Sequence, residues 1–393
     1  FLDMDGLKFV NDSYGHPVGD LLIKEAGNRL KNLLSNTGKL ARIGGDEFLI
    51  MQPYTSFNEI NELAQLIVQH MQTPVHLNKK TLPLNSSLGI ACYPEHGDDW
   101  ISLFQNADCA MYAAKNKNKG SFEVYQQRFT NETLRKFELE NELREAVENN
   151  KINVYFQPIL DTETQMLCGY EALARWESPT LGAISPDEFI PLAEQSDLIT
   201  ELGSKVMSQA LYFIKHHCYE NEYVSVNVSS KQLQNPKFGT TLTQLISDNQ
   251  VNPKQLVLEV TENVLTEVSK NLSKVSESMA LSGIRVFVDD FGTGYSNLMQ
   301  LRKLKFSALK VDREFIHDLL SSKSDQSLVK AIALMAKEMG LNVIAEGVET
   351  EAQRQCLVKL GIQYGQGFYW NKAQNQQYWS ELKNSEKKAR QNH

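Results

Sequence analysis

The later part of the chain repeats one local pattern, which is a short apolar run, a polar residue at its end, and then a segment with helical spacing. The repeats are separated by about 20 to 55 residues, the length of strand-plus-helix units with insertions, and they predict a (β/α)₈ barrel. In such barrels the carboxyl ends of the strands open at one mouth, so we expect the polar residues to converge there. These residues are Glu171, Asn227, Glu259, Asp289, Asp290, Lys310 and Glu346.

The clearest unit is the stretch from Arg285 to Gly294, where an apolar run is followed by Asp289, Asp290 and a glycine-rich turn. Two adjacent carboxylates after a buried strand are costly to desolvate unless a cation or hydrogen-bond donors meet them. An Asp-rich turn would explain one such pair better than a binding site does. The recurrence of the same layout along the chain favours a shared site.

The expected set of side chains is rich in oxygen and contains neither His nor Cys. Ligands of this kind select hard cations such as Mg²⁺ or Mn²⁺ over Zn²⁺. Asp289 and Asp290 can bridge two ions, as in displacement reactions at phosphorus, and Lys310 can neutralise developing charge or hold a water. A metal-dependent phosphodiesterase and an enolase-like enzyme both remain open, because each places magnesium-binding acids and a Lys at a barrel mouth.

Length and composition limit the other possibilities. A chain of 393 residues predicts two domains, and 41% hydrophobic and 22% charged residues are typical of globular protein. The net charge of -8 argues against a nucleic acid polymer as partner, but leaves open a small anion in a local site. Five cysteines, odd in number and without metal-ligand spacing, indicate free thiols and a cytoplasmic location.

The chain shows no apolar run of about 18 residues and no signal peptide, so we expect no membrane segment in it. It opens at Phe1 inside an expected strand. We therefore expect an upstream part, which includes the case that this is the cytoplasmic part of a membrane-anchored sensor.

Four segments are expected along the chain: an α/β domain at residues 1–125, a connecting helix at 126–144, the barrel domain at 145–380, and a polar tail at 381–393. The first domain would have its amino-terminal part missing. Its elements would be strands at 1–4, 84–92 and 122–125, helices at 19–34, 58–71 and 101–115, and a hairpin at 40–51 with Gly44-Gly45-Asp46 at its tip.

The motif Glu171-Ala172-Leu173-Ala174-Arg175-Trp176 resembles the one that names the EAL family of cyclic di-GMP phosphodiesterases. The resemblance covers about residues 145 to 375. Its other motifs are Gln157-Pro158-Ile159, Val226-Asn227-Val228-Ser229, Glu259-Val260-Thr261-Glu262, Asp289-Asp290-Phe291-Gly292-Thr293-Gly294, Leu309-Lys310-Val311-Asp312, Ala345-Glu346-Gly347-Val348-Glu349 and Gly365-Gln366-Gly367. It implies a modified TIM barrel and hydrolysis of cyclic di-GMP to linear pGpG with two Mg²⁺ or Mn²⁺ ions.

The resemblance also implies a role for each matching residue. Glu171, Asn227, Glu259 and Asp289 would hold one metal ion, and Asp289, Asp290 and Glu346 a second. The catalytic group would comprise Lys310, Glu346, Glu349 and Glu262, with Lys310 and Glu349 handling the attacking water and Glu262 bracing the loop 290–296. Gln157, Arg175 and Gln366 would contact the substrate, Arg175 through its fork to a phosphate. Asp197 stands where the family usually has Gly, which would alter a local turn.

The stretch Arg42-Ile43-Gly44-Gly45-Asp46-Glu47-Phe48 resembles the GGDEF motif of diguanylate cyclases, supported by the run from Asp3 to Asp12. By resemblance, Asp3 and Asp46 would bind metal and Glu47 would assist at a triphosphate. Asn11 and Asp20 would read guanine, and Lys8, Lys115 and Lys119 would neutralise phosphates. This domain would therefore bind GTP, as a regulator or for a second activity.

Two further interpretations of the whole chain stay open beside a phosphodiesterase. One is a catalytically silent receptor that binds cyclic di-GMP in the same pocket. The other is a net diguanylate cyclase. Both sites carry most of their expected residues, and a barrier change of about 1.4 kcal/mol shifts a rate tenfold, so the sequence does not set which activity is faster. The family also implies a homodimer through the EAL domains.

Overall fold

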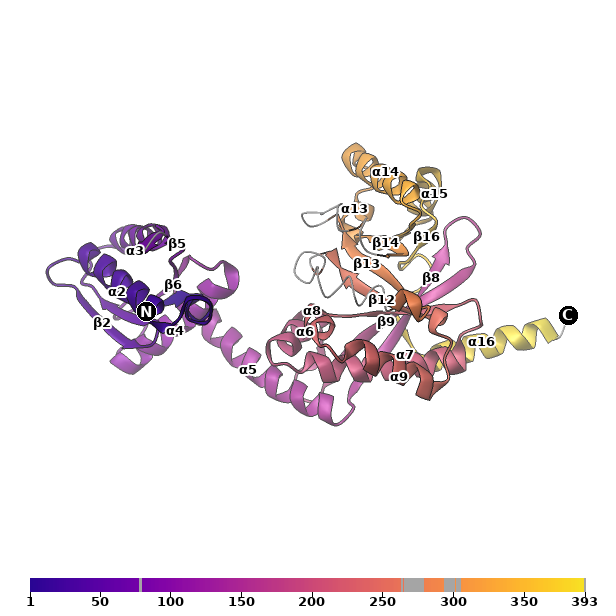
Figure 1. Ribbon diagram of the computed structural model, residues 1–393, viewed down its shortest axis with the longest axis horizontal. Coiled ribbons are helices and arrows are strands. Elements are labelled where there is room, and N and C mark those ends of the chain that lie inside the picture. Colours follow the sequence, from indigo (N-terminus) through magenta and orange to yellow (C-terminus); the bar gives the residue numbers. More distant parts are fainter. Residues whose placement is uncertain (78–79, 263, 265–278, 293–300, 302–304, 392–393) are drawn as a thin grey trace. The chain divides into compact units, whose positions relative to one another are not determined.

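The computed structural model describes residues 1–77, 80–262, 264, 279–292, 301 and 305–391. The chain divides into two compact units, Phe1–Glu138 and Leu139–His393 (Figure 1). The division point lies within α5 (Gln127–Glu148) and within the segment predicted as a connecting helix. None of the helices in the described ranges is long and apolar enough to cross a membrane.

The first unit is built on a five-stranded sheet in the order β2-β3-β1-β6-β7, with β6 and β7 parallel and the other neighbours antiparallel. Its strands are β1 (Leu2–Asp5), β2 (Lys39–Gly44), β3 (Glu47–Met51), β6 (Asn85–Ile90) and β7 (Phe122–Val124). Its helices are α1 (Leu7–Tyr14), α2 (His16–Leu33), α3 (Phe57–Gln72) and α4 (Trp100–Lys117). Its core includes Leu2, Met4, Leu22, Leu30 and Met71.

Most of the predicted elements of this unit lie within three residues of the observed ones. Two elements were missed: α1, in which only Leu7 and Val10 are buried, and the small hairpin of β4 (Val75–Leu77) and β5 (Lys80–Leu82). The segment that forms α1 has too few apolar residues at helical spacing to predict a helix. The predicted hairpin at 40–51 is present as β2 and β3, and Gly45 adopts a positive φ of 40° in its turn.

In the second unit, eight described strands close into a barrel, which confirms the predicted modified TIM barrel. They are β8 (Ile152–Asp161), β9 (Leu167–Ser178), β11 (Tyr223–Asn227), β12 (Leu256–Thr261), β13 (Arg285–Phe291), β14 (Ala308–Val311), β15 (Asn342–Ala345) and β16 (Tyr364–Gly365). Neighbours from β9 to β16 run parallel. Strand β8 is antiparallel to both β9 and β16, and this reversal is the modification.

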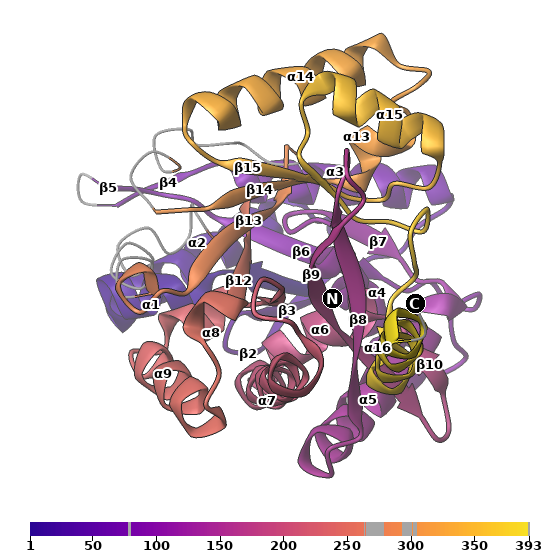
Figure 2. The same cartoon turned by 90° about the vertical axis from the view of Figure 1, so that its right-hand side faces the viewer.

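Helices cover the barrel from two sides: α13, α14 and α15 lie on one side of the strands, and α6, α7, α8 and α9 on the other (Figures 1 and 2). The bounds are α6 (Pro186–Gln195), α7 (Ile199–His217), α8 (Ser230–Gln234), α9 (Phe238–Asn249), α13 (Arg313–His317), α14 (Lys323–Glu338), α15 (Glu351–Leu360) and α16 (Gln376–Gln391). The short elements are η1 (Pro253–Gln255), β10 (Gly182–Ile184), which pairs with β9, and β17 (Gln374–Asn375), which pairs with β8. Residues 381–391, predicted as a polar tail, belong to α16.

The barrel interior is layered because side chains on one face of a strand recur at every second residue. One apolar layer consists of Ile159, Tyr223, Val257, Phe287, Ala308 and Ile344. Two residues further along the parallel strands come Ser225, Glu259, Asp289, Lys310 and Glu346. On the reversed strand β8, Gln157 comes two residues before Ile159. The strand period thus stacks a polar layer directly on an apolar one, at the carboxyl ends of the parallel strands.

Candidate active site

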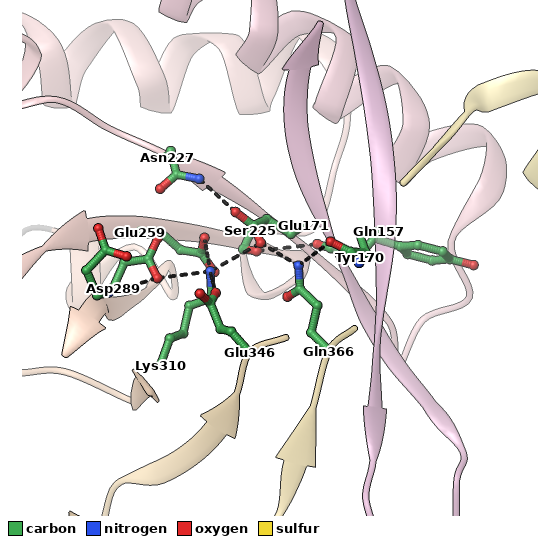
Figure 3. A network of polar contacts seen from close by, with 11 residues as sticks. Gln157, Tyr170, Glu171, Ser225, Asn227, Glu259, Asp289, Lys310, Glu346 and Gln366 are labelled. Atoms are coloured by element: carbon green, nitrogen blue, oxygen red, sulfur yellow. Dashed lines mark hydrogen bonds and ion pairs between the residues drawn. The ribbon is translucent and has the colours of Figure 1, made fainter. Parts of the chain in front are cut away.

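Lys310 lies at the centre of the polar layer and is fully buried. Its Nζ is 2.6 Å from Glu346 Oε1, 3.0 Å from Glu259 Oε2, 3.1 Å from Asp289 Oδ1 and 3.2 Å from Glu171 Oε2 (Figure 3). Three carboxylates from three strands and a fourth from the residue after β15 therefore meet one ammonium, as the repeat pattern predicted.

The acids of this cluster outnumber the lysine. Burial alone would lower the pKa of Lys310, but the surrounding carboxylates raise it well above its usual value. Burial raises the pKa of Glu259 well above its usual value and that of Glu346 to about 8, in each case against the opposing effect of Lys310. Glu171 has a lowered pKa, because Lys310 and several hydrogen bonds outweigh its burial. The cluster thus holds more acid than one lysine neutralises.

The donor set fits divalent cations. Glu171, Glu259 and Asp289 each offer an oxygen within 4.8 Å of the others, and so do Asp289, Asp290 and Glu346. Glu259 Oε1 is buried and has no hydrogen-bond partner within the described ranges. An all-oxygen set with an orphaned carboxylate oxygen suits Mg²⁺ or Mn²⁺. Asn227 donates from Nδ2 to Glu171 Oε1 at 2.9 Å, so its amide lies at the rim of the first group.

An irregularity in β13 allows Asp289 and Asp290 to act together. Adjacent residues of a regular strand point to opposite faces, yet both carboxylates join one cluster. The register with β14 shifts between Val288 and Phe291, and Asp290 has a positive φ of 54°. Such a bulge re-aims a side chain, and the left-handed conformation of a non-Gly residue costs about 1–3 kcal/mol. Burial, with the charge of Asp289, raises the pKa of Asp290 to about 6.

Gln157 and Gln366 form a chain of amides that ends on Glu171. Gln366 donates from Nε2 to Glu171 Oε2 at 2.6 Å and to Gln157 Oε1 at 2.9 Å, and Gln157 donates to the Asn371 carbonyl at 3.2 Å (Figure 3). Both glutamines are buried. In the structure these two side chains orient the Glu171 carboxylate. The substrate contact expected for them stays a prediction.

Three other predicted residues lie around this cluster. Glu262 is buried and accepts a hydrogen bond from Gly292 N at 3.0 Å, while residues 293–296 of the loop that it was predicted to brace lie outside the described residues. Arg175 is half-buried on β9 and donates to the Ala174 carbonyl, and burial lowers its pKa. Glu349 is exposed, and its backbone N–H donates to Gln353 Oε1 at 2.9 Å. The structure does not bring Glu349 into contact with the cluster.

Two further points differ from the expectations. Glu171 was expected at a strand end, but β9 continues to Ser178, so the residue lies within the strand. Ser225 was overlooked although it is fully buried and pairs in register with Glu171. The alternation along β11, two residues after Tyr223, is the signal that would have found it. Asp197 takes a φ of 62°, which fits a position where Gly is usual.

The first unit also gathers its predicted acids. Asp3 Oδ1 is 2.6 Å from Lys115 Nζ, and Met4 N donates to the Asp46 carbonyl at 3.1 Å. Burial and the charges of Asp3 and Asp46 raise the pKa of Glu47. Lys115 thus pairs with Asp3, and the charges of Asp3 and Asp46 reach Glu47, but among the described residues these three acids do not converge as closely as those of the barrel.

Asn11 and Asp20, the residues predicted to read guanine, lie where α1 meets α2. A Cβ added to Gly19 would be 1.9 Å from Asn11 Oδ1, so the Asn11 side chain occupies the space beside that glycine, next to Asp20. Lys8 and Lys119 are exposed. Their contact with phosphates stays a prediction.

Comparison with known proteins gives two family matches. Residues 140–373 match the EAL domain, and residues 1–121 match the family described as diguanylate cyclase, GGDEF domain. The chain is 34% identical to "Bifunctional diguanylate cyclase/cyclic di-GMP phosphodiesterase MucR" of Pseudomonas aeruginosa, over 94% of this chain and 54% of that protein. It is 35% identical to "Cyclic di-GMP phosphodiesterase PdeR" of Escherichia coli, over 95% of this chain and 56% of that protein. The chain thus spans about half the length of these curated relatives.

Among solved structures, "PaMucR Phosphodiesterase, c-di-GMP complex" matches with a TM-score of 0.58 and 33% identity, over 61% of this chain and 98% of that one. "Structure of EAL Enzyme Bd1971 - cAMP and cyclic-di-GMP bound form" matches with a TM-score of 0.62 and 27% identity, over 73% of this chain and 77% of that one. Both resemblances noted in the sequence are therefore confirmed.

Proposed function

Because this chain belongs to the EAL domain family and carries a GGDEF domain ahead of its EAL domain, we propose that its barrel hydrolyses cyclic di-GMP to linear pGpG. The reaction would use two divalent cations, Mg²⁺ or Mn²⁺. The names of the similar phosphodiesterases and the cyclic di-GMP in the similar structure support this substrate.

One observation carries the proposal: two groups of carboxylate oxygens lie side by side and share Asp289. Glu171 and Glu259 complete one group, and Asp290 and Glu346 the other. Adjacent sites for hard cations suit an in-line displacement at phosphorus, because ions held there would polarise the phosphoryl oxygens and lower the pKa of an attacking water.

The chain's own residues would then divide the work. Lys310 would stabilise negative charge that develops beside the carboxylates, from a position fixed by four ion pairs. The Gln366 amide would hold Glu171 in one orientation. Arg175 would bind a phosphate of the substrate through its fork, and Glu349 would approach the attacking water from the β15–α15 loop.

The first unit would bind GTP, either to regulate the barrel or to make cyclic di-GMP. The ion pair of Asp3 with Lys115 and the charges of Asp3 and Asp46 near Glu47 support this, because acids can bind the metal ion of a nucleotide and a lysine can neutralise its triphosphate. A homodimer through the EAL domains and a cytoplasmic location are proposed on family likeness and thiol content alone.

The test is product analysis of the full chain incubated with cyclic di-GMP and Mg²⁺ or Mn²⁺. Wild type should yield linear pGpG, Glu171→Gln should lose this activity, and Glu220→Gln, which changes an exposed acid, should keep it. Binding of cyclic di-GMP without product in wild type would identify a silent receptor. Net synthesis from GTP, with no hydrolysis, would identify a cyclase.

A further inference from the structure

The barrel has a cavity of about 350 Å³ at the amino ends of its parallel strands, opposite the carboxylate cluster. It is lined by the first residues of several strands, such as Tyr223 of β11, Arg285 of β13 and Asn342 of β15. Phe287, Ala308 and Ile344 also line it, and each comes two residues before an acid or lysine of the active site. An apolar layer therefore separates this cavity from the site described above.

Arg285 gives the cavity a fixed positive charge. Its guanidinium carbon lies 4.5 Å from the centre of the Tyr223 ring and 5.8 Å from that of Phe287. Its Nη2 donates to the Lys254 carbonyl at 3.2 Å, and it makes no other hydrogen bond within the described ranges. Since a guanidinium carries five N–H donors and stays charged, most of the fork remains available, and the two rings orient it in advance.

Tyr223 adds a hydroxyl donor to the cavity lining. The side chain is only 7% exposed, and its hydroxyl has no hydrogen-bond partner among the residues that the structure describes. Burial raises the pKa of this phenol, so it is protonated at neutral pH. The ring fits tightly, because a Cβ at Gly169 would lie 2.8 Å from it. Tyr223 lines the cavity, so an acceptor bound there can accept a hydrogen bond from its hydroxyl.

The rest of the polar lining favours an acceptor-rich ligand. Tyr364 and the amides of Asn221 and Asn342 line the same cavity. Asp161 supplies a carboxylate there, but its Oδ1 already accepts from Thr164 N at 2.7 Å, Thr164 Oγ1 at 2.9 Å and Glu163 N at 3.0 Å. Within the described part of the chain, the donors of Arg285, Tyr223, Tyr364, Asn221 and Asn342 thus surround an apolar floor, and Arg285 is a cation.

We propose that this cavity is a second ligand site, which binds a small molecule carrying a carboxylate or phosphate group. The oxyanion would lie on the Arg285 fork, whose geometry matches both groups, and accept from the Tyr223 hydroxyl. The apolar part of the ligand would rest on Phe287, Ala308 and Ile344. The volume lies in the range of sites for small molecules.

The proposal is tested by isothermal titration calorimetry on the full chain, without divalent cations, using benzoate and inorganic phosphate as probes. Wild type should bind at least one probe saturably, in the millimolar range or tighter. Arg285→Gln should weaken this binding about tenfold or more, because it removes a charged hydrogen bond. Arg144→Gln, which removes an exposed arginine of α5 that does not line the cavity, should leave the affinity for the probe unchanged.

A second variant guards against loss of folding in Arg285→Gln. Tyr223→Phe keeps the ring contacts and removes only the unpartnered hydroxyl, so it should fold like wild type and bind the probe about threefold or more weakly. Absence of saturable binding of both probes to wild type, or binding that Arg285→Gln leaves unchanged, would overturn the proposal. The titration needs neither substrate nor activity, so its result is independent of the proposed hydrolysis.

Discussion

Replacing Lys310 with Met should destabilise the second unit strongly when no divalent cation is present. The substitution keeps the length of the side chain and removes an ammonium that lies 2.6–3.2 Å from four carboxylate oxygens, with no exposure to solvent. Removing one partner of a buried ion pair costs about 3–5 kcal/mol, because the remaining charge stays buried without compensation. We expect a loss of this size in the free energy of unfolding.

The loss should depend on pH in a defined direction. A carboxyl with a raised pKa in the folded state holds its proton more tightly than in the unfolded state, so it lowers stability as pH rises. For Glu346 this window runs from its ordinary value of 4.5 to about 8. Without Lys310 the pKa values of Glu171 and Glu346 rise. The difference between Lys310→Met and wild type should therefore grow with pH from below 4.5, where Glu171 loses its proton in wild type, and again above about pH 8, where Glu346 does. Added Mg²⁺ should reduce the difference, because the cation replaces the missing positive charge.

Urea unfolding in the presence of a chelator measures this, with tryptophan fluorescence as the signal. Trp176, Trp370 and Trp379 lie in the second unit, so the signal reports mainly on the barrel. Lys359→Met, which changes an exposed lysine of α15, is the matched control and should stay within about 0.5 kcal/mol of wild type. A loss below about 1 kcal/mol for Lys310→Met, constant with pH, would refute the reasoning.

Three other variants test separate parts of the account. Gln366→Leu should weaken Mn²⁺ binding about 10- to 100-fold, measured by titration, because it removes the amide that orients Glu171; unchanged affinity would contradict that role. Trp379→Ala should lower the free energy of unfolding by about 3–5 kcal/mol, because this buried ring docks α16 and donates to the Phe156 carbonyl at 2.9 Å; a stable variant would show that α16 is dispensable. Asp3→Asn should weaken GTP binding with Mg²⁺ while leaving the barrel's metal affinity intact, and equal effects on both sites would argue against separate sites.

The positions of the acids in the barrel could be predicted because they follow a simple sequence pattern along each strand. A buried parallel strand reads as a short apolar run, and the polar residue that follows the run must face the mouth if the run is long enough. Glu259, Asp289, Lys310 and Glu346 follow this rule. The same rule misplaced Glu171 at a strand end, because the pairing of β9 with β8 extends the strand to Ser178.

Other features depend on contacts that the sequence pattern does not carry. The antiparallel direction of β8 is set by its pairing with β9 and β16, and no local signal in the strand distinguishes direction. The bulge that lets Asp290 join Asp289 is a matter of register with β14. The buried amides of Gln157 and Gln366 meet across 209 residues of chain, so only the closed barrel shows that they hold Glu171.

The measurement closest to the central claim is anomalous diffraction from crystals of the full chain grown with Mn²⁺. We expect two peaks in the second unit, one among Glu171, Glu259 and Asp289 and the other among Asp289, Asp290 and Glu346, with Asp289 shared. Crystals in which Mn²⁺ occupies neither position, while the four carboxylates stay closed around Lys310, would contradict it.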